Sequence, residues 1–186
     1  PFSWNESIKP EVNSVENLKF DEKRSKELRN IGFGTVLTHN MDGIMRGTGA
    51  IVSLNSDAEQ NIVIKEKAST HYSFSKGSTQ QNYPNSLMGA VALLKQSFLD
   101  AEWYVQNKGK INEVNLSLEA INNNKSLPKI IEVRDKIRVL LAQKIGKEIN
   151  HNFIIKGTGD EYQRLNEIQK NKSKLIVPIN FPKAYN

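Results

Sequence analysis

Residues 152–165 read NFIIKGTGDEYQRL, and this stretch decides the fold. Phe153, Ile154 and Ile155 form an apolar run with the length of a buried strand. A turn with two glycines follows, and from Asp160 the apolar residues recur with a helical period. A strand, a short turn and a helix in this order form the repeating unit of a parallel α/β sheet.

The same unit recurs on both sides of this stretch. A strand is predicted at 129–133 (KIIEV) and another at 175–179 (LIVPI), and an amphipathic helix is predicted at 134–149. Strands that alternate with helices through short connections form right-handed βαβ units. The predicted fold class is therefore α/β, built of parallel strand–helix units, either as a partial (β/α) barrel or as an open sheet. Residues 128–180 form its predicted βαβαβ core.

The first two thirds of the chain are less regular. Residues 1–20 are an irregular N-terminal segment, and 21–186 are predicted to form a single α/β domain. Within that domain, the polar stretch 69–82 has no period, and loops of this length are usually functional or mobile. The other predicted elements are helices at 21–30, 84–106 and 116–121 and strands at 33–38, 48–54 and 62–64.

Composition excludes several classes of function. The chain has 186 residues, a net charge of +6 and no cysteine, so disulfides and thiolate chemistry are excluded. Its 26 basic residues are dispersed among 20 acidic ones, and no RNA-binding motif is found, so a nucleic-acid partner is not expected. No apolar run approaches the roughly 18 residues of a membrane span, so a membrane partner is not expected either.

Polar side chains end the predicted parallel strands. Aligning the apolar runs places Glu132, Lys156 and Pro178 at equivalent heights, with Asn180 just beyond. Ligands bind at this carboxyl edge in barrels and in open sheets. Glu132 and Lys156 are therefore the candidate catalytic pair, as base and electrophile or as holders of a polar ligand. The alternative is a structural ion pair that closes the mouth of the sheet, which is the commoner arrangement.

Three histidines are available. His39 follows the first strand and His71 falls in the long polar segment, and with Asn180 they are the candidate ligand-binding residues. His151 precedes a strand and is expected at the opposite edge. No HxH pair and no HExxH motif occurs, so no metal site made by this chain alone is predicted.

Two further motifs have structural explanations. Asp160 and Glu161 are acids at the start of a helix, where the helix dipole favours negative charge. The two GTG sequences, 47–49 and 157–159, could present backbone amides to an anion, but neither matches a known phosphate-binding fingerprint.

Three stretches that cover about half of the chain resemble the amidohydrolase superfamily, specifically its imidazolonepropionase-like members. They are LRNIGFGTVLTHNMDGIMRGTGAIVSL (28–54), HYSFSKGSTQQNYPNSLMGAVALLKQSFLDAEWY (71–104) and DKIRVLLAQKIGKEINHNFIIKGTGDEYQRL (135–165). The resemblance implies a metal-dependent (β/α)₈ barrel that hydrolyses C–N bonds in cyclic or linear amides.

The chain departs from this family in two respects. A complete barrel needs roughly 250 residues, so an internal portion of a larger chain is expected, with the HxH strand upstream and an aspartate downstream. At the two positions where the family has metal-binding histidines on middle strands, the alignment gives Glu132 and Gly157. A glycine has no side chain to bind a metal.

Two functional hypotheses follow. The chain is part of an amidohydrolase-like hydrolase that acts on non-peptide C–N bonds when complete, and the complete protein could then hold a divalent metal. Alternatively, it is a degenerate, non-catalytic module that binds a polar ligand or supports a neighbouring catalytic domain. The expected partners are a small polar amide-type substrate or ligand and the remainder of the parent chain. The resemblance also implies an exported, periplasmic protein.

Overall fold

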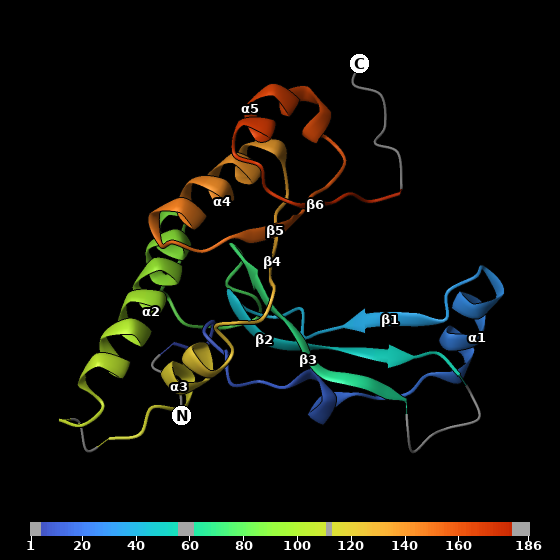
Figure 1. Cartoon of the computed structure of the whole chain (residues 1–186), viewed down its shortest axis with the longest axis horizontal. Coiled ribbons are helices and arrows are strands. Elements are labelled where there is room, and N and C mark those ends of the chain that lie inside the picture. Colours follow the sequence, from blue (N-terminus) through green and yellow to red (C-terminus); the bar gives the residue numbers. More distant parts are fainter. Residues whose placement is uncertain (1–4, 56–61, 111–112, 180–186) are drawn as a thin grey trace.

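The computed structural model of the chain describes residues 5–55, 62–110 and 113–179. Its strands form one six-stranded sheet in the order β1-β2-β3-β4-β5-β6 (Figure 1). The strands are β1 (Thr35–Thr38), β2 (Met45–Ser53), β3 (Val63–Ser73), β4 (Lys129–Glu132), β5 (Phe153–Lys156) and β6 (Leu175–Ile176). β1, β2 and β3 pair antiparallel, whereas β3, β4, β5 and β6 pair parallel. Within the described residues the sheet stays open, with β1 and β6 at its edges.

The helices are α1 (Glu22–Asn30), α2 (Leu87–Asn107), α3 (Leu116–Asn123), α4 (Lys136–Glu148) and α5 (Leu165–Lys170), with 3₁₀ turns η1 (Ser14–Asn17) and η2 (Glu161–Arg164). None of the helices in the described part of the chain is long and apolar enough to cross a membrane. The parallel strands alternate with helices, as the sequence predicts, so the α/β fold class of parallel strand–helix units is confirmed.

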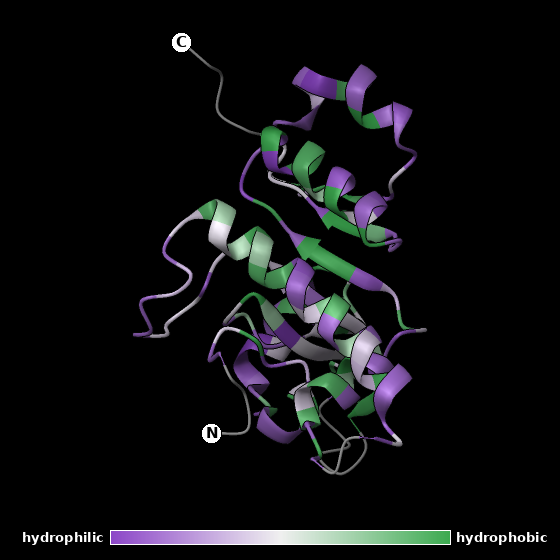
Figure 2. Ribbon diagram, turned by 90° about the vertical axis from the view of Figure 1, so that its left-hand side faces the viewer, coloured by the Kyte–Doolittle hydropathy of each residue, from purple (hydrophilic) through white to green (hydrophobic). Residues whose placement is uncertain are grey.

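Helices α2 and α4 cover one face of the parallel strands (Figure 1). Side chains alternate between the two faces of a strand, and Ile131 and Ile155, neighbours in register, are both fully buried in the main core with both helices. Glu132 and Lys156 therefore lie on the opposite face. Figure 2 shows hydrophobic residues in these central strands and mainly hydrophilic residues in the outer helical region that includes α5.

Local sequence signals explain where the two covering helices begin. Ser86 precedes α2 and its hydroxyl accepts a hydrogen bond from the amide of Gly89, while Asp135 does the same for the amide of Arg138 at α4. From there, apolar residues recur at helical spacing and are buried, such as Leu94 in α2. Burying one such side chain contributes about 1.5–3 kcal/mol, which is what holds the helices to the sheet.

The first strands differ from the sequence prediction. β3 runs to Ser73, so residues 69–73, predicted as the start of a loop, are the buried end of a strand. Because most of these side chains are polar, the sequence shows no apolar strand pattern at this position. The segment is nevertheless a strand, because β2 and β4 pair with it on its two sides. β6 is shorter than predicted, and Ile176 rather than Pro178 pairs with Lys156, since proline has no amide hydrogen for a sheet ladder.

The N-terminal segment packs along β2. Ile8 forms a bridge with Met45 and is 1% exposed, so this irregular stretch is part of the core. Gly47 has φ +81°, and a Cβ at this position would lie 2.0 Å from the carbonyl oxygen of Val12. Close approach of two backbones therefore accounts for the first GTG sequence, which does not need an anion ligand.

Candidate functional site

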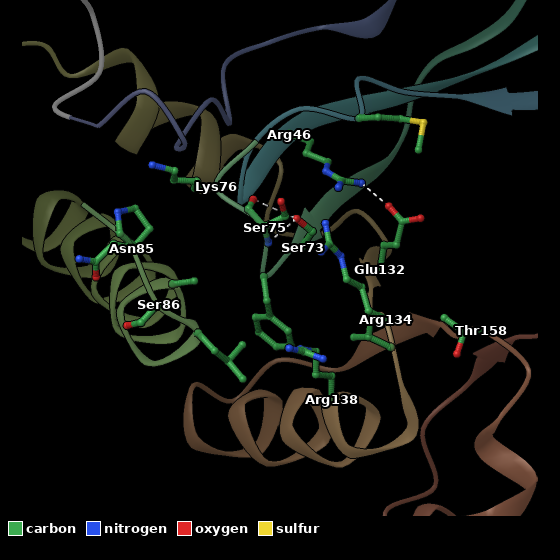
Figure 3. A pocket seen from close by; sticks show the side chains of 16 residues that line it. Arg46, Ser73, Ser75, Lys76, Asn85, Ser86, Glu132, Arg134, Arg138 and Thr158 are labelled. Atoms are coloured by element: carbon green, nitrogen blue, oxygen red, sulfur yellow. Dashed lines mark hydrogen bonds and ion pairs between the residues drawn. The ribbon is translucent and has the colours of Figure 1, made fainter. Parts of the chain in front are cut away.

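A cleft of about 640 Å³ lies at the carboxyl ends of the parallel strands β3 and β4 (Figure 3). Its walls come from the residues that follow these two strands and from the first turns of α2 and α4. The lining includes Arg46, Ser73, Phe74, Ser75, Lys76, Asn85, Ser86, Leu87, Glu132, Arg134, Arg138 and Thr158. This volume is in the range of small-molecule sites, and the carboxyl edge is where α/β proteins bind ligands.

Glu132 ends β4 and holds two cationic side chains. Its Oε2 lies 2.6 Å from a terminal nitrogen of Arg46, and its Oε1 lies 3.0 Å from Nζ of Lys156. The Arg46 side chain is only 6% exposed, whereas that of Lys156 is 41% exposed. The predicted pair is therefore a triad that joins β2, β4 and β5. Figure 3 shows the Arg46–Glu132 contact at the edge of the cleft.

The triad fixes the charge of the carboxylate. Burial raises the pKa of Glu132, but hydrogen bonds from Arg46 and Lys156 outweigh burial and hold the pKa at about 2. Glu132 is therefore ionised at every ordinary pH. Its carboxylate can accept hydrogen bonds. It cannot act as a general acid, because it carries no proton, and its low pKa makes it a weak base.

His39 and His71 stack on each other on the same face as the triad. Their ring centroids are 3.7 Å apart with an interplanar angle of 9°. His71 lies on β3 and is 3% exposed, so its prediction as a loop residue was wrong. Gly49 makes room for it, because a Cβ there would lie 2.5 Å from its Nε2. This glycine belongs to the first GTG sequence.

Both histidines are neutral at pH 7. Burial, together with smaller contributions from the nearby His39, Arg46 and Lys156, lowers the pKa of His71 to about 3. Burial also lowers the pKa of His39. Nδ1 of His39 donates to the carbonyl oxygen of Asn40 at 2.6 Å, and Nε2 of His71 shares a hydrogen bond of 2.8 Å with the Ser69 hydroxyl.

The turn in the opening stretch encloses a buried carboxylate. Glu161, which is 4% exposed, accepts hydrogen bonds from the amides of Thr158 at 2.6 Å and Gly159 at 2.8 Å. A Cβ on Gly157 would lie 1.8 Å from one of its oxygens. The amides of the second GTG sequence are therefore bound by the protein's own acid. Asp160, expected to cap a helix, makes no side-chain capping bond to η2.

The other predicted residues lie apart from the cleft. Of the predicted site residues within the described part of the chain, only Glu132 lines it. His151 precedes β5 and packs against Phe98, with ring centroids 4.6 Å apart, at the opposite edge as predicted. Asn180 lies outside the described residues.

Sequence reasoning missed the cleft's cationic side chains. Arg46 sits in the apolar run IMRGTGAIV, and a buried arginine in such a strand signals a carboxylate partner. Lys76 and Arg134 follow strands, Arg138 lies in the first turn of α4, and none of them carries a motif, so nothing in the sequence distinguishes them from the other basic residues.

The fold of this chain has a counterpart among solved structures. Its fold resembles that of an amidohydrolase. The crystal structure of an amidohydrolase from Thermotoga maritima MSB8 matches with a TM-score of 0.76 and 17% sequence identity. The match covers 94% of this chain and 50% of that chain, so this chain spans about half the length of that protein. No sequence-family model matches the chain, and no curated protein matches it significantly.

At this level of identity the match shows a shared fold alone. The likeness to an amidohydrolase fold agrees with the resemblance, whereas the (β/α)₈ barrel and the imidazolonepropionase-like subtype stay predictions. The resemblance also implies a divalent metal at the carboxyl edge, so the residues at the two aligned positions, Glu132 and Gly157, decide whether this chain could hold one.

The residues of this chain do not fit a metal ion. Arg46 and Lys156 already neutralise Glu132, and their charges would repel a divalent cation there. Position 157 has no side chain, and the carboxylate of Glu161 fills the space where one would begin. Among the residues that the structure describes, no group of three or more His, Asp or Glu side chains is placed to hold a metal.

Proposed function

We propose that this chain is part of an amidohydrolase-like protein that hydrolyses C–N bonds other than peptide bonds, and that its share is to bind the substrate. The observation that carries the proposal is the shared fold over 94% of the chain. The cleft at the carboxyl ends of β3 and β4 supports it, because this edge holds the site in barrels of this kind.

In this proposal a small polar amide binds in the cleft. The ionised carboxylate of Glu132 accepts a hydrogen bond from an amide N–H, and Arg46 and Lys156 keep that carboxylate charged and oriented. The resemblance assigns metal chemistry to ligands upstream and downstream of these residues. The role of this chain is then to orient the scissile amide rather than to activate water.

The proposal is tested by blocking the cleft. Asn85 is exposed at the cleft wall, so Asn85→Trp fills the cleft without removing a buried contact. Asn123→Trp is the matched control, because Asn123 is exposed at the end of α3 beside the far half of α2. The intact protein is assayed against N-acyl amino acids and cyclic amides for released amine or carboxylate.

We expect hydrolysis in the unmodified protein and in the Asn123 variant, and its loss in the Asn85 variant. Equal activity in all three proteins would refute the placement of the substrate in this cleft. Absence of activity against every amide in the unmodified protein would refute the hydrolase proposal.

A second candidate is a degenerate, non-catalytic module that binds a polar ligand or supports a neighbouring catalytic domain. It is favoured by one observation, namely that Glu161 fills the space of a side chain at position 157. This candidate predicts ligand binding in the cleft without turnover, so calorimetric binding of an amide that the protein does not hydrolyse would support it.

The resemblance further leads us to propose that the protein is exported to the periplasm. Cell fractionation followed by immunodetection tests this, and recovery of the protein only with the cytoplasmic fraction would contradict it.

A further inference from the structure

Positive charge dominates the cleft. Four cationic side chains line it, those of Arg46, Lys76, Arg134 and Arg138, against the single carboxylate of Glu132. A concave site lined by charges of one sign concentrates its field, so this cleft attracts anions.

Only part of this charge is neutralised inside the protein. Glu132 is shared between Arg46 and Lys156, which leaves one positive charge in excess, and Arg138 pairs with Asp135. Lys76 donates to the carbonyl oxygen of Gln81 at 2.9 Å, a contact that leaves its charge uncompensated.

Arg134 is the most available cation. It is exposed at the end of β4, and no hydrogen bond or ion pair to another described residue is recorded for its guanidinium. Figure 3 shows its side chain directed into the space between β3 and α4, while Lys76, Asn85 and Ser86 lie across that space.

The nearby acids are engaged elsewhere. Asp135 caps the amide of Arg138, and Asp160 accepts from the hydroxyl of Thr158 and from the amide of Lys136. Among the described residues, neither Arg134 nor Lys76, which both line the cleft, forms an ion pair with a carboxylate.

The first turn of α2 adds donors to the same cleft. This 21-residue helix begins at Leu87, which lines the cleft with Ser86. The Ser86 hydroxyl caps only the amide of Gly89, so the amides of the helix's first two residues have no intrahelical partner. The positive end of the helix dipole thus points into a cleft that already carries excess positive charge.

We propose that this cleft binds the anionic group, a carboxylate or a phosphate, of a small organic ligand, between Arg134, Lys76 and the first turn of α2. The cleft is much larger than an anion alone, so the ligand carries an organic part beside its charge. This inference concerns the cleft in which the proposed function places the substrate. The anionic group follows from the charges of the cleft, and only the amide part of the ligand rests on the proposed function.

The test compares matched probes on the intact protein. N-acetylglycine carries a carboxylate, N-acetylglycinamide is the same amide without the charge, and inorganic phosphate is the other anion. Thermal unfolding is followed at constant ionic strength, adjusted with sodium chloride. A bound probe at about five times its dissociation constant raises the unfolding temperature by about 2–4 °C.

Two charge-removing variants make the result specific. Arg134→Gln removes the available guanidinium, and Arg24→Gln removes an equal charge from α1, where Arg24 is exposed and distant from the cleft (Figure 1). Both positions are exposed, so both variants should unfold at the temperature of the unmodified protein. The Arg134 variant should bind the anion roughly tenfold or more weakly, and the Arg24 variant should not change.

Stabilisation by N-acetylglycine assigns the anion as a carboxylate, and stabilisation by phosphate alone assigns it as a phosphate. Three outcomes overturn the inference. They are no stabilisation by either anion, equal stabilisation by N-acetylglycinamide, and an equal loss of anion affinity in the Arg134 and Arg24 variants. Anion binding without amide hydrolysis would contradict the hydrolase proposal alone, whereas hydrolysis of neutral amides without anion binding would contradict the anion site alone.

Discussion

Replacing Glu132 by glutamine should destabilise the protein strongly at neutral pH. The change keeps the shape of the side chain but removes the charge between Arg46 and Lys156. Arg46 is the decisive partner, because its side chain is 6% exposed and would be left as a buried cation without a counter-charge. Such losses are among the largest that single substitutions produce.

The magnitude follows from the pKa of Glu132. Its lowering from 4.5 to about 2 corresponds to about 3 kcal/mol of stability, at about 1.4 kcal/mol per pKa unit. Because the folded-state pKa is below the unfolded one, this contribution is complete above about pH 4.5 and disappears as the pH falls towards 2. For a chain of this size, about 3 kcal/mol lowers the unfolding temperature by about 6–12 °C.

The assay is thermal unfolding of the unmodified protein and of the Glu132→Gln variant, followed by circular dichroism between pH 7 and pH 2. The two unfolding temperatures should differ most at pH 7 and converge below about pH 3. An unchanged unfolding temperature at pH 7, or a difference that persists at pH 2, would refute the reasoning. Lys144→Gln on the exposed side of α4 is the control for loss of a charge.

Three other predictions concern Gly157, bound metal and His71. Gly157→Ala should lower the free energy of unfolding by about 1–3 kcal/mol, because the new methyl group displaces Glu161 from two amides. Gly109→Ala is the control and should cost little, because a Cβ at 109 meets open space. Equal effects of the two substitutions in thermal unfolding would contradict this prediction. Elemental analysis of the chain purified without chelators should find no stoichiometric divalent metal, and a full equivalent of zinc, manganese or iron would show the prediction to be wrong. In an NMR titration, His71 should stay neutral to below pH 4, since burial lowers its pKa to about 3; protonation near pH 6.5 would exclude the stacked arrangement.

The parallel half of the fold could be predicted because its strands are short apolar runs bounded by turns. The runs at 129–132 and 153–156 also fixed the register, since aligning them placed Glu132 beside Lys156, as the structure does. The antiparallel half could be predicted only in outline. The end of β3 is polar, and its burial depends on neighbours on both sides that no local pattern reveals.

The candidate site could be predicted only where it follows from the register. Arg46 reaches Glu132 across 86 positions in sequence, and this contact depends on the pairing of β2 and β4 with opposite edges of β3. Arg134 and Lys76 line the same cleft for a similar reason. No periodic apolar pattern surrounds either residue in the sequence. Their place in the lining of the cleft therefore depends wholly on where the first turns of α2 and α4 come together.

Gly157 and Glu161 constrain the order in which this site could change during evolution. A larger residue at 157 meets the carboxylate of Glu161 at once, whereas shortening Glu161 first frees both the space and two backbone amides. A side chain able to bind a metal could therefore appear at 157 only after a change at 161 that itself costs stability. The two positions are therefore coupled, and placing a larger side chain at 157 takes two substitutions in a fixed sequence.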